Sequence, residues 1–265
     1  MSVRTEPWPS GTPCWVDVAS SDPAAASGFY RDLLGWEVRE GPAGSGGYRM
    51  AFVSGQVVAG IRQGGAAGWT VYLASDDMRQ TLDAVIAAGG RVLTPPTALL
   101  GEAVMAVVED PGGAVFGVWQ PLDLIGARMV NEPGAFCWDE LMTSEYAAAR
   151  AFYTEVFGFR YADHGASTHA YSMLRIDAAT VGGIGAIGPG PWPESPHWLV
   201  YFSVDDADGV ASRAAGLGGH VRVAPTDTPL GRMAVLQGPE RELFAVLQAD
   251  DLPRSTRETP ETTMV

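Results

Sequence analysis

The chain has 265 residues, of which 46% are hydrophobic, so it carries enough apolar material for the cores of two domains. Its formal net charge of -14 argues against nucleic acid and against an anionic membrane surface, because both are bound through Lys and Arg. No stretch reads as a transmembrane span or a signal peptide, and Cys14 and Cys137 are expected to be small buried thiols. These features predict a reduced, soluble, cytoplasmic protein.

The amino-terminal third contains a segment that recurs half a chain later. Residues 13–38 read PCWVDVASSDPAAASGFYRDLLGWEV, and their counterparts begin FCWDELMTSEYAAARAFYTEVFGFRY. The Cys-Trp pair, the three alanines, the Phe-Tyr pair and a glycine all keep their places. Similarity at a fixed spacing indicates a duplicated structural unit.

Taken in chain order, the first unit is predicted as a strand over residues 12–19 and a helix over 23–34 that ends at Gly35. Short strands follow at 36–40, 48–54 and 56–62. A second unit of the same kind has a strand at 69–75, a helix at 77–88, and strands at 91–93, 102–109 and 114–120. The first half therefore contains two β-α-β-β-β units.

The second half repeats this plan. We expect a first domain over residues 11–120, a linker over 121–133 and a second domain over 134–248, again of two units. Its last unit opens with a strand at 197–202 and a helix at 206–216, and closes with strands at 233–237 and 243–248. Residues 249–265 are polar and are predicted to be a disordered tail.

Four β-α-β-β-β units that carry D-P-x-x-A-x-x-F-Y-x-x-L-x-G-W, A-A-G-G and D-P-G-G resemble the vicinal-oxygen-chelate superfamily. Within it the chain is most similar to two-domain glyoxalase-like and bleomycin-resistance-like proteins of actinobacteria. The resemblance implies an α+β fold of two domains, each with a curled, cup-shaped mixed sheet and helices on the outside. It also implies small-molecule binding in the cup, which metalloenzyme members perform with Fe, Mn, Ni or Zn.

The family places one metal ligand about seven residues before the acidic residue that opens each helix. Counting back from Asp22, Asp76, Glu145 and Asp205 gives tryptophan every time: Trp15, Trp69, Trp138 and Trp198. An indole has an N–H donor and no lone pair for a metal. The last-strand positions fall on Gly117 and Ala245, so we expect no metal site and no other cofactor.

The four tryptophans are predicted to point into the cups, where they either fill the core or form an aromatic-walled pocket. Asp17 and Glu140 should share the face of Trp15 and Trp138. Each is either a structural carboxylate or a desolvated acid–base group. Four further residues are candidate lining, with packing roles as the alternative: Tyr48, Tyr171, Arg175 and His197.

The favoured function is a metal-independent protein, a monomer or homodimer, that binds a small hydrophobic or aromatic metabolite in a natural-product or resistance role. The alternative is a metal-free isomerase, lyase or hydroxylase-like enzyme that uses Asp17 or Glu140 as its acid or base. An interaction protein with filled cups is a third possibility. A metal-dependent lactoylglutathione lyase is the least favoured.

Overall fold

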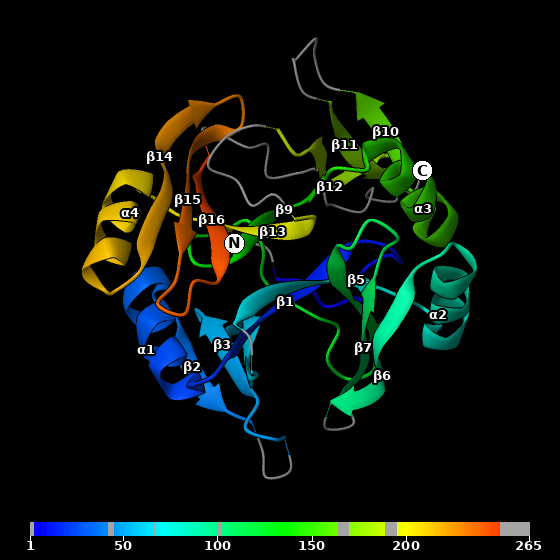
Figure 1. The fold of residues 1–265 in the computed structure, drawn as a ribbon. Coiled ribbons are helices and arrows are strands. Elements are labelled where there is room, and N and C mark those ends of the chain that lie inside the picture. Colours follow the sequence, from blue (N-terminus) through cyan, green and yellow to red (C-terminus); the bar gives the residue numbers. More distant parts are fainter. Residues whose placement is uncertain are drawn as a thin grey trace, which may run out of the picture.

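A computed structural model describes residues 3–41, 45–65, 67–99, 102–163, 170–188 and 195–249. Within these ranges the chain forms two eight-stranded mixed sheets and four helices, an α+β fold as predicted (Figure 1). Of the predicted tail, only Ala249 lies inside the described residues.

The first sheet is built from the two units of the amino-terminal half, in the order β2-β3-β4-β1-β5-β8-β7-β6. Strands β1 and β5 pair antiparallel at its centre and join the two units into one sheet. The elements are β1 (Pro13–Ser20), α1 (Pro23–Leu34), β2 (Glu37–Glu40), β3 (Arg49–Val53), β4 (Gln56–Gln63), β5 (Gly68–Ala74), α2 (Met78–Ala87), β6 (Arg91–Leu99), β7 (Ala103–Glu109) and β8 (Val115–Pro121).

The second sheet repeats this order as β10-β11-β12-β9-β13-β16-β15-β14, with β9 and β13 antiparallel at its centre. Both sheets curl without closing into barrels. Its elements are β9 (Phe136–Thr143), α3 (Tyr146–Phe157), β10 (Arg160–Asp163), β11 (Tyr171–Ile176), β12 (Ala179–Ala186), β13 (His197–Ser203), α4 (Ala207–Gly216), β14 (His220–Thr228), β15 (Gly231–Gln237) and β16 (Leu243–Gln248). We call the concave face of the first sheet the first cup and that of the second sheet the second cup.

Helix ends follow the sequence signals. The Asp22 carboxylate accepts hydrogen bonds from the backbone N–H groups of Ala24 and Ala25, and α1 ends at Gly35 in the left-handed conformation, with φ of 75°. Helix α3 ends in the same way at Gly158, with φ of 71°. The Asp-Asp pairs before α2 and α4 use their second residue as the N-cap, which is Asp77 in one case and Asp206 in the other.

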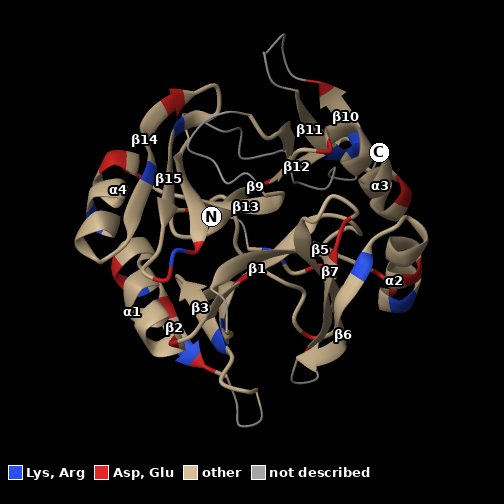
Figure 2. Cartoon of the chain, in the orientation of Figure 1, with Lys and Arg blue, Asp and Glu red and all other residues tan. Residues whose placement is uncertain are grey.

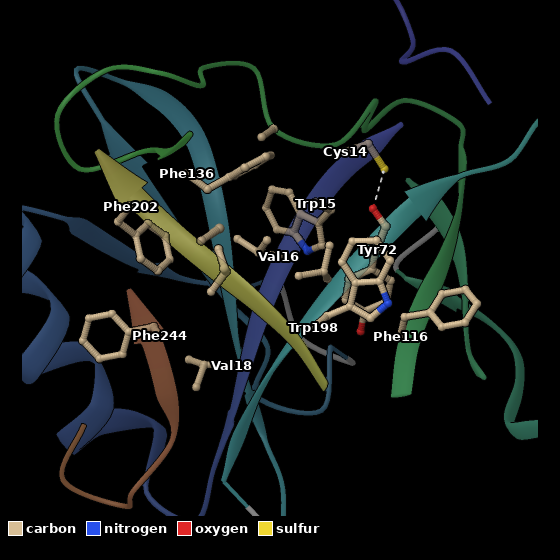
Figure 3. Packing of buried hydrophobic residues seen from close by; sticks show 14 of the residues in the cluster. Cys14, Trp15, Val16, Val18, Tyr72, Phe116, Phe136, Trp198, Phe202 and Phe244 are labelled. Carbon is tan, nitrogen blue, oxygen red and sulfur yellow. Dashed lines mark hydrogen bonds between the residues drawn. The ribbon is translucent and has the colours of Figure 1, made fainter. Parts of the chain in front are cut away.

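The two sheets lie back to back, with their central strands in the middle of the molecule and their arms curling away from each other (Figure 1). Aromatic residues fill the interface between them: the Phe202 ring lies 5.6 Å from Trp36 and 5.0 Å from Trp69. Figure 3 shows Val16, Val18, Phe202 and Phe244 in this core. Because the convex faces are used for packing, the two cups open on opposite sides.

Hydrogen bonds cross between the halves at two equivalent places. Tyr30 of α1 donates to Glu242 over 2.9 Å, and Tyr153 of α3 donates to Asp110 over 3.2 Å. Tyr30 and Tyr153 occupy matching positions of the repeat. Each half therefore contributes a tyrosine to a buried carboxyl of the other half.

The segment between β8 and β9 packs along the first sheet. The backbone N–H of Ala127 donates to the carbonyl oxygen of Cys14 over 2.8 Å. The backbone N–H of Arg128 donates to the carbonyl oxygen of Val57 over 2.9 Å. Both cysteines are buried free thiols, as expected.

Charged side chains are concentrated on the helices and on outer strands and turns, while the central strands carry few (Figure 2). None of the helices in the described ranges is long and apolar enough to cross a membrane.

Candidate ligand-binding site

The four tryptophans do not share the concave faces, which corrects the sequence prediction. Trp69 pairs across the sheet with Val18, so it lies on the convex face, where its indole N–H donates to Tyr30 over 3.1 Å. Trp198 is also convex; its indole N–H donates to Tyr153 over 2.9 Å, and Figure 3 shows it within the packed core. Of these four tryptophans, Trp15 and Trp138 lie in the cups.

The error came from the Asp-Asp pairs. The helices are capped by Asp77 and Asp206, so the position seven residues earlier is Thr70 in one unit and Leu199 in the other. Thr70 pairs with Asp17, and Leu199 pairs with Glu140. A shift of one residue along a strand moves every side chain to the opposite face.

Asp17 is at the centre of the first cup and is fully buried. Tyr72 donates to its Oδ2 over 3.0 Å and Tyr48 donates to the same oxygen over 3.2 Å, while Arg62 Nε lies 3.2 Å from Oδ1. Burial raises the pKa of Asp17, and the charge of Arg62 followed by these hydrogen bonds opposes the rise. Asp17 thus holds three side chains in place.

Trp15 completes this buried cluster. Its indole N–H donates to the Tyr48 hydroxyl over 2.9 Å, and its ring lies 5.4 Å from that of Trp119 at an interplanar angle of 32°. Neither Trp15 nor Trp119 is solvent-exposed. Trp15 is therefore the floor of the first cup rather than an exposed wall.

Glu140 has the equivalent position in the second cup. Tyr201 donates to Oε1 over 2.6 Å and Tyr171 donates to Oε2 over 2.9 Å. Burial raises the pKa of Glu140, opposed by these two hydroxyls and by the nearby Trp138. The position that Arg62 holds beside Asp17 is occupied by Gly185 beside Glu140, so this carboxyl has no matching cation.

Glycines allow the tyrosines to lie against the sheet. A Cβ at Gly60 would collide with the Tyr48 hydroxyl, one at Gly183 with the Tyr171 hydroxyl, and one at Gly117 with the Tyr72 ring. Gly117 is the last-strand position at which the family's metalloenzymes carry a glutamate. Here the ring of Tyr72 takes up that space.

The donor set of the cups does not fit a metal ion. The first-strand ligand positions are Trp15, Thr70, Trp138 and Leu199, of which only the threonine has a lone pair to offer. The carboxyls of Asp17 and Glu140 are already hydrogen-bonded to tyrosine hydroxyls. In the described part of the chain, no three His, Cys, Asp or Glu residues are grouped so that they could hold a metal ion.

A cavity of about 490 Å³ opens on one side of the first cup. Apolar side chains from β3, β4 and the segment after β8 line it, and the Arg39 guanidinium stacks 4.2 Å over the Phe52 ring. Tyr48 is shared between the cavity wall and the Asp17 cluster. The described lining residues are Arg39, Glu40, Gly41, Tyr48, Met50, Phe52, Gly55, Gln56, Val57, Glu102, Asp123, Leu124 and Arg128.

The remaining predicted residues belong to the second cup. Tyr171, Arg175 and His197 are half-buried there, and Trp138 is half-buried where its counterpart Trp15 is fully buried. The structure therefore divides the predicted set between two sites, with Tyr48 in the first cup and the others in the second.

Sequence reasoning missed Tyr72, Tyr201 and Arg62. The two tyrosines had a detectable signal, because Trp-x-x-Tyr occurs in both opening strands, at 69–72 and at 198–201. The tyrosine of that motif lies on the opposite face from its tryptophan and reaches the buried carboxyl. Arg62 has no counterpart in the repeat and left no such signal.

Paired β-α-β-β-β units in curled open sheets, with carboxyls and aromatic residues in the cups, define a protein of the glyoxalase and dioxygenase fold class. The chain belongs to the Glyoxalase/Bleomycin resistance protein/Dioxygenase superfamily: that family model matches residues 136–246, and a glyoxalase-like domain matches residues 15–119.

Two curated relatives are similar over most of their length. The chain is 40% identical to "Putative glyoxylase CFP32" of Mycobacterium tuberculosis, over 94% of this chain and 98% of that protein. It is 36% identical to the anthracycline biosynthesis protein DnrV of Streptomyces peucetius, over 90% of this chain and 93% of that protein.

Solved structures share the fold at low identity. The Mn(II)-bound glyoxalase from Novosphingobium aromaticivorans has a TM-score of 0.65 at 19% identity, covering 91% of this chain and 82% of that one. The 2,2',3-trihydroxybiphenyl 1,2-dioxygenase from Sphingomonas wittichii has a TM-score of 0.64 at 13% identity, covering 93% and 94%. These likenesses concern architecture alone.

Proposed function

We propose that the protein binds a small, flat, largely apolar metabolite in the first-cup cavity without a resident metal, and that it serves natural-product metabolism. The relative from Streptomyces peucetius, named for anthracycline biosynthesis, supports the biological setting. The donor set described above supports binding through shape and aromatic surface.

The single observation that carries this proposal is the cavity beside Tyr48. Its volume of about 490 Å³ falls within the range of about 300–1,000 Å³ that is usual for small-molecule sites. Met50, Phe52, Val57 and Leu124 supply an apolar lining. Such a surface favours an aromatic ligand, because burial of apolar area on both sides of a flat ring is the main source of affinity.

The test is to fill the cavity. Phe52→Trp should weaken binding of the tightest ligand from a panel of aromatic natural products by at least about tenfold, as measured by isothermal titration calorimetry. Val115→Trp is the matched control, because it adds the same ring at a residue that is 40% exposed and outside the cavity lining. Equal affinities for Phe52→Trp and the native protein would reject the cavity as the site.

Metal independence is tested separately. Dialysis against EDTA should leave affinity unchanged, and elemental analysis of protein purified without chelators should give well under one equivalent of Mn, Fe, Ni or Zn. One equivalent of such a metal, lost together with ligand binding on chelation, would contradict the proposal.

A second candidate function is a metal-free enzyme that uses Glu140 as its acid or base. The observation that favours it is a buried carboxyl whose hydrogen-bond partners among the described residues are two tyrosine hydroxyls, with Gly185 at the position that Arg62 holds in the first cup. A carboxyl with a raised pKa is suited to proton transfer near neutral pH. Asp17 is less suited, because Arg62 favours its ionised form.

For this candidate, Glu140→Gln keeps the shape of the side chain and removes the titrating group. Turnover of any compound that the native protein converts, followed by mass spectrometry, should fall by at least about a hundredfold while the circular dichroism spectrum is unchanged. Full turnover by the variant would exclude Glu140 as the acid or base.

A further inference from the structure

The second cup contains buried polar atoms that no protein group satisfies. Among the described residues, Nε2 of His197, Nε of Arg175 and Nε1 of Trp138 are buried without a hydrogen-bond partner. We propose that the second cup is a separate binding site for a flat aromatic molecule that carries a hydroxyl at one end and a carbonyl or carboxylate at the other.

His197 supplies an acceptor. Its Nδ1 lies 2.8 Å from the carbonyl oxygen of Ser195, and since a carbonyl can only accept, Nδ1 carries the proton. The opposite nitrogen, Nε2, then has a free lone pair in the neutral ring. Burial lowers the pKa of His197, opposed by the Ser195 contact, so the neutral ring is favoured. A lone pair in this setting matches a ligand hydroxyl.

Arg175 and Trp138 supply donors. Nη2 of Arg175 donates to the Ala178 carbonyl over 2.8 Å, which fixes the guanidinium and leaves its Nε–H free. The Trp138 indole lies close enough to Glu140 to oppose the rise in its pKa, yet makes no hydrogen bond of ordinary geometry. These donors match an oxygen acceptor, and the charge of Arg175 favours a carboxylate.

The strand register places these groups at opposite ends of the cup. His197 pairs with Met142, and Arg175 pairs with Thr180, which lies on β12 toward the end of β9 that carries Trp138. The ligand's hydroxyl and its acceptor oxygen should therefore lie at opposite ends of a flat body that crosses Glu140.

The surface between these ends is apolar. Seven buried residues form a cluster distinct from the main core: Cys137, Leu199, Tyr201, Met233, Val235, Ala245 and Leu247. Trp138 packs against this cluster and is itself half-buried. A flat aromatic body would pack against the half-buried Trp138 at the edge of this cluster and bring its polar ends to the unsatisfied atoms.

The first cup does not have this pattern. Trp15 is satisfied by Tyr48, Phe52 stands where the second cup has Arg175, and Gly68 stands where it has His197. Unsatisfied buried polar atoms are rare in folded proteins because they cost free energy. Their presence among the described residues of the second cup therefore points to a ligand that satisfies them.

The test uses 7-hydroxyflavone as probe, with 7-methoxyflavone as its matched analogue that cannot donate a hydrogen bond. Titrations use the full chain with Phe52→Trp, which blocks the first cup, so that this test is independent of the proposed function. We expect one equivalent of 7-hydroxyflavone to bind, at least about tenfold more tightly than the methyl ether. Trp138 fluorescence should change on binding.

Substitution of His197 should remove the preference for the hydroxyl. His197→Phe should bring the two affinities to within about twofold, whereas His220→Phe, at an exposed histidine, should leave the preference intact. Arg175→Leu should weaken both probes several-fold, through loss of the contact to their carbonyl. Thermal melts establish that each variant is folded.

Three outcomes would overturn the inference. The first is no binding of 7-hydroxyflavone to the Phe52→Trp protein, and the second is equal affinity of that protein for the two probes. The third is a preference for the hydroxyl that persists after His197→Phe is added. If Phe52→Trp proves not to affect ligand binding, the proposed function fails, while the His197→Phe comparison still tests the second cup.

Discussion

The two cups place a carboxyl at the same position and treat it differently. Asp17 in the first cup is paired with Arg62 and held by two tyrosines, whereas Glu140 in the second has two tyrosines and, in place of the arginine, Gly185. The comparison shows that a duplicated framework can keep one carboxyl in an ion pair and hold the other by tyrosine hydroxyls alone among its described hydrogen-bond partners.

The cups also differ in access. Trp15 and Tyr48 are 0% and 3% exposed, while their counterparts Trp138 and Tyr171 are half-buried. In the first cup Trp119 packs on Trp15. The strand pairing shows that Leu247 has the position of Trp119 in the second cup. A second indole thus closes over Trp15 in one cup and leaves the cavity to one side, while Trp138 in the other cup stays half-buried.

The largest expected effect separates the two carboxyls by stability. Asp17→Asn should lower the free energy of unfolding by about 3 kcal/mol, because it leaves the Arg62 charge unpaired. This loss is at the lower end of the range for breaking a buried ion pair, because the Arg62 side chain is 30% exposed. Glu140→Gln should cost less than about 1 kcal/mol, since no charge is stranded. Urea denaturation at pH 7 measures both, and equal losses would remove the distinction between the cups.

A somewhat smaller effect concerns the glycines beneath the tyrosines. Gly60→Ala should cost about 2 kcal/mol, because the added Cβ displaces a fully packed Tyr48 and breaks its contacts to Asp17 and Trp15. Gly183→Ala should cost about half as much, since the half-buried Tyr171 can move toward solvent. Thermal melts of the two variants compare them, and a greater loss for Gly183→Ala would contradict the difference in packing.

The dependence on pH gives a finer comparison. The folded-state pKa of Glu140 is raised above its ordinary value of 4.5, so its contribution to stability is present below pH 4.5 and is lost as pH rises through the folded pKa. Glu140→Gln does not titrate. The melting temperature of Glu140→Gln should therefore rise relative to that of the native protein as pH increases above 4.5. A constant difference across this window would show that Glu140 titrates as it does in the unfolded chain.

The smallest expected change is spectroscopic. Acrylamide should quench Trp138 and should not reach Trp15, because the first is half-buried and the second is 0% exposed. Trp138→Phe should lower the fraction of the emission that acrylamide quenches. Trp15→Phe should leave the absolute intensity of the quenchable emission unchanged. The reverse result would assign the accessible centre to the first cup.

Much of the fold could be predicted from the sequence because the signals are local and occur twice. The strand before Asp22, the helix that follows it and the helix end at Gly35 all appear in the structure as expected, and Gly158 ends the repeated helix in the same way. The face of Trp69 and Trp198 could not be predicted correctly, because either aspartate of an Asp-Asp pair can cap a helix and only the backbone geometry shows which one does.

The site was less predictable because its contacts are distant in sequence. Arg62 and Tyr72 reach Asp17 from two other strands, and Tyr72 does so over Gly117, a residue type that strand patterning treats as a turn or weak point. The cavity depends on Leu124 and Arg128, from a segment predicted to be a linker, which packs against the first sheet. No local pattern reports such a contact.

The crossed contacts of Tyr30 with Glu242 and of Tyr153 with Asp110 have a consequence for the independence of the halves. Each half would lose the acceptor of its own helix tyrosine if the chain were divided, and would uncover the convex aromatic surface around Trp69 or Trp198. Although the sequence reads as two copies of one module, either copy expressed alone should be an aggregation-prone, partly ordered fragment. Mixing the two fragments should restore a single unit that unfolds cooperatively.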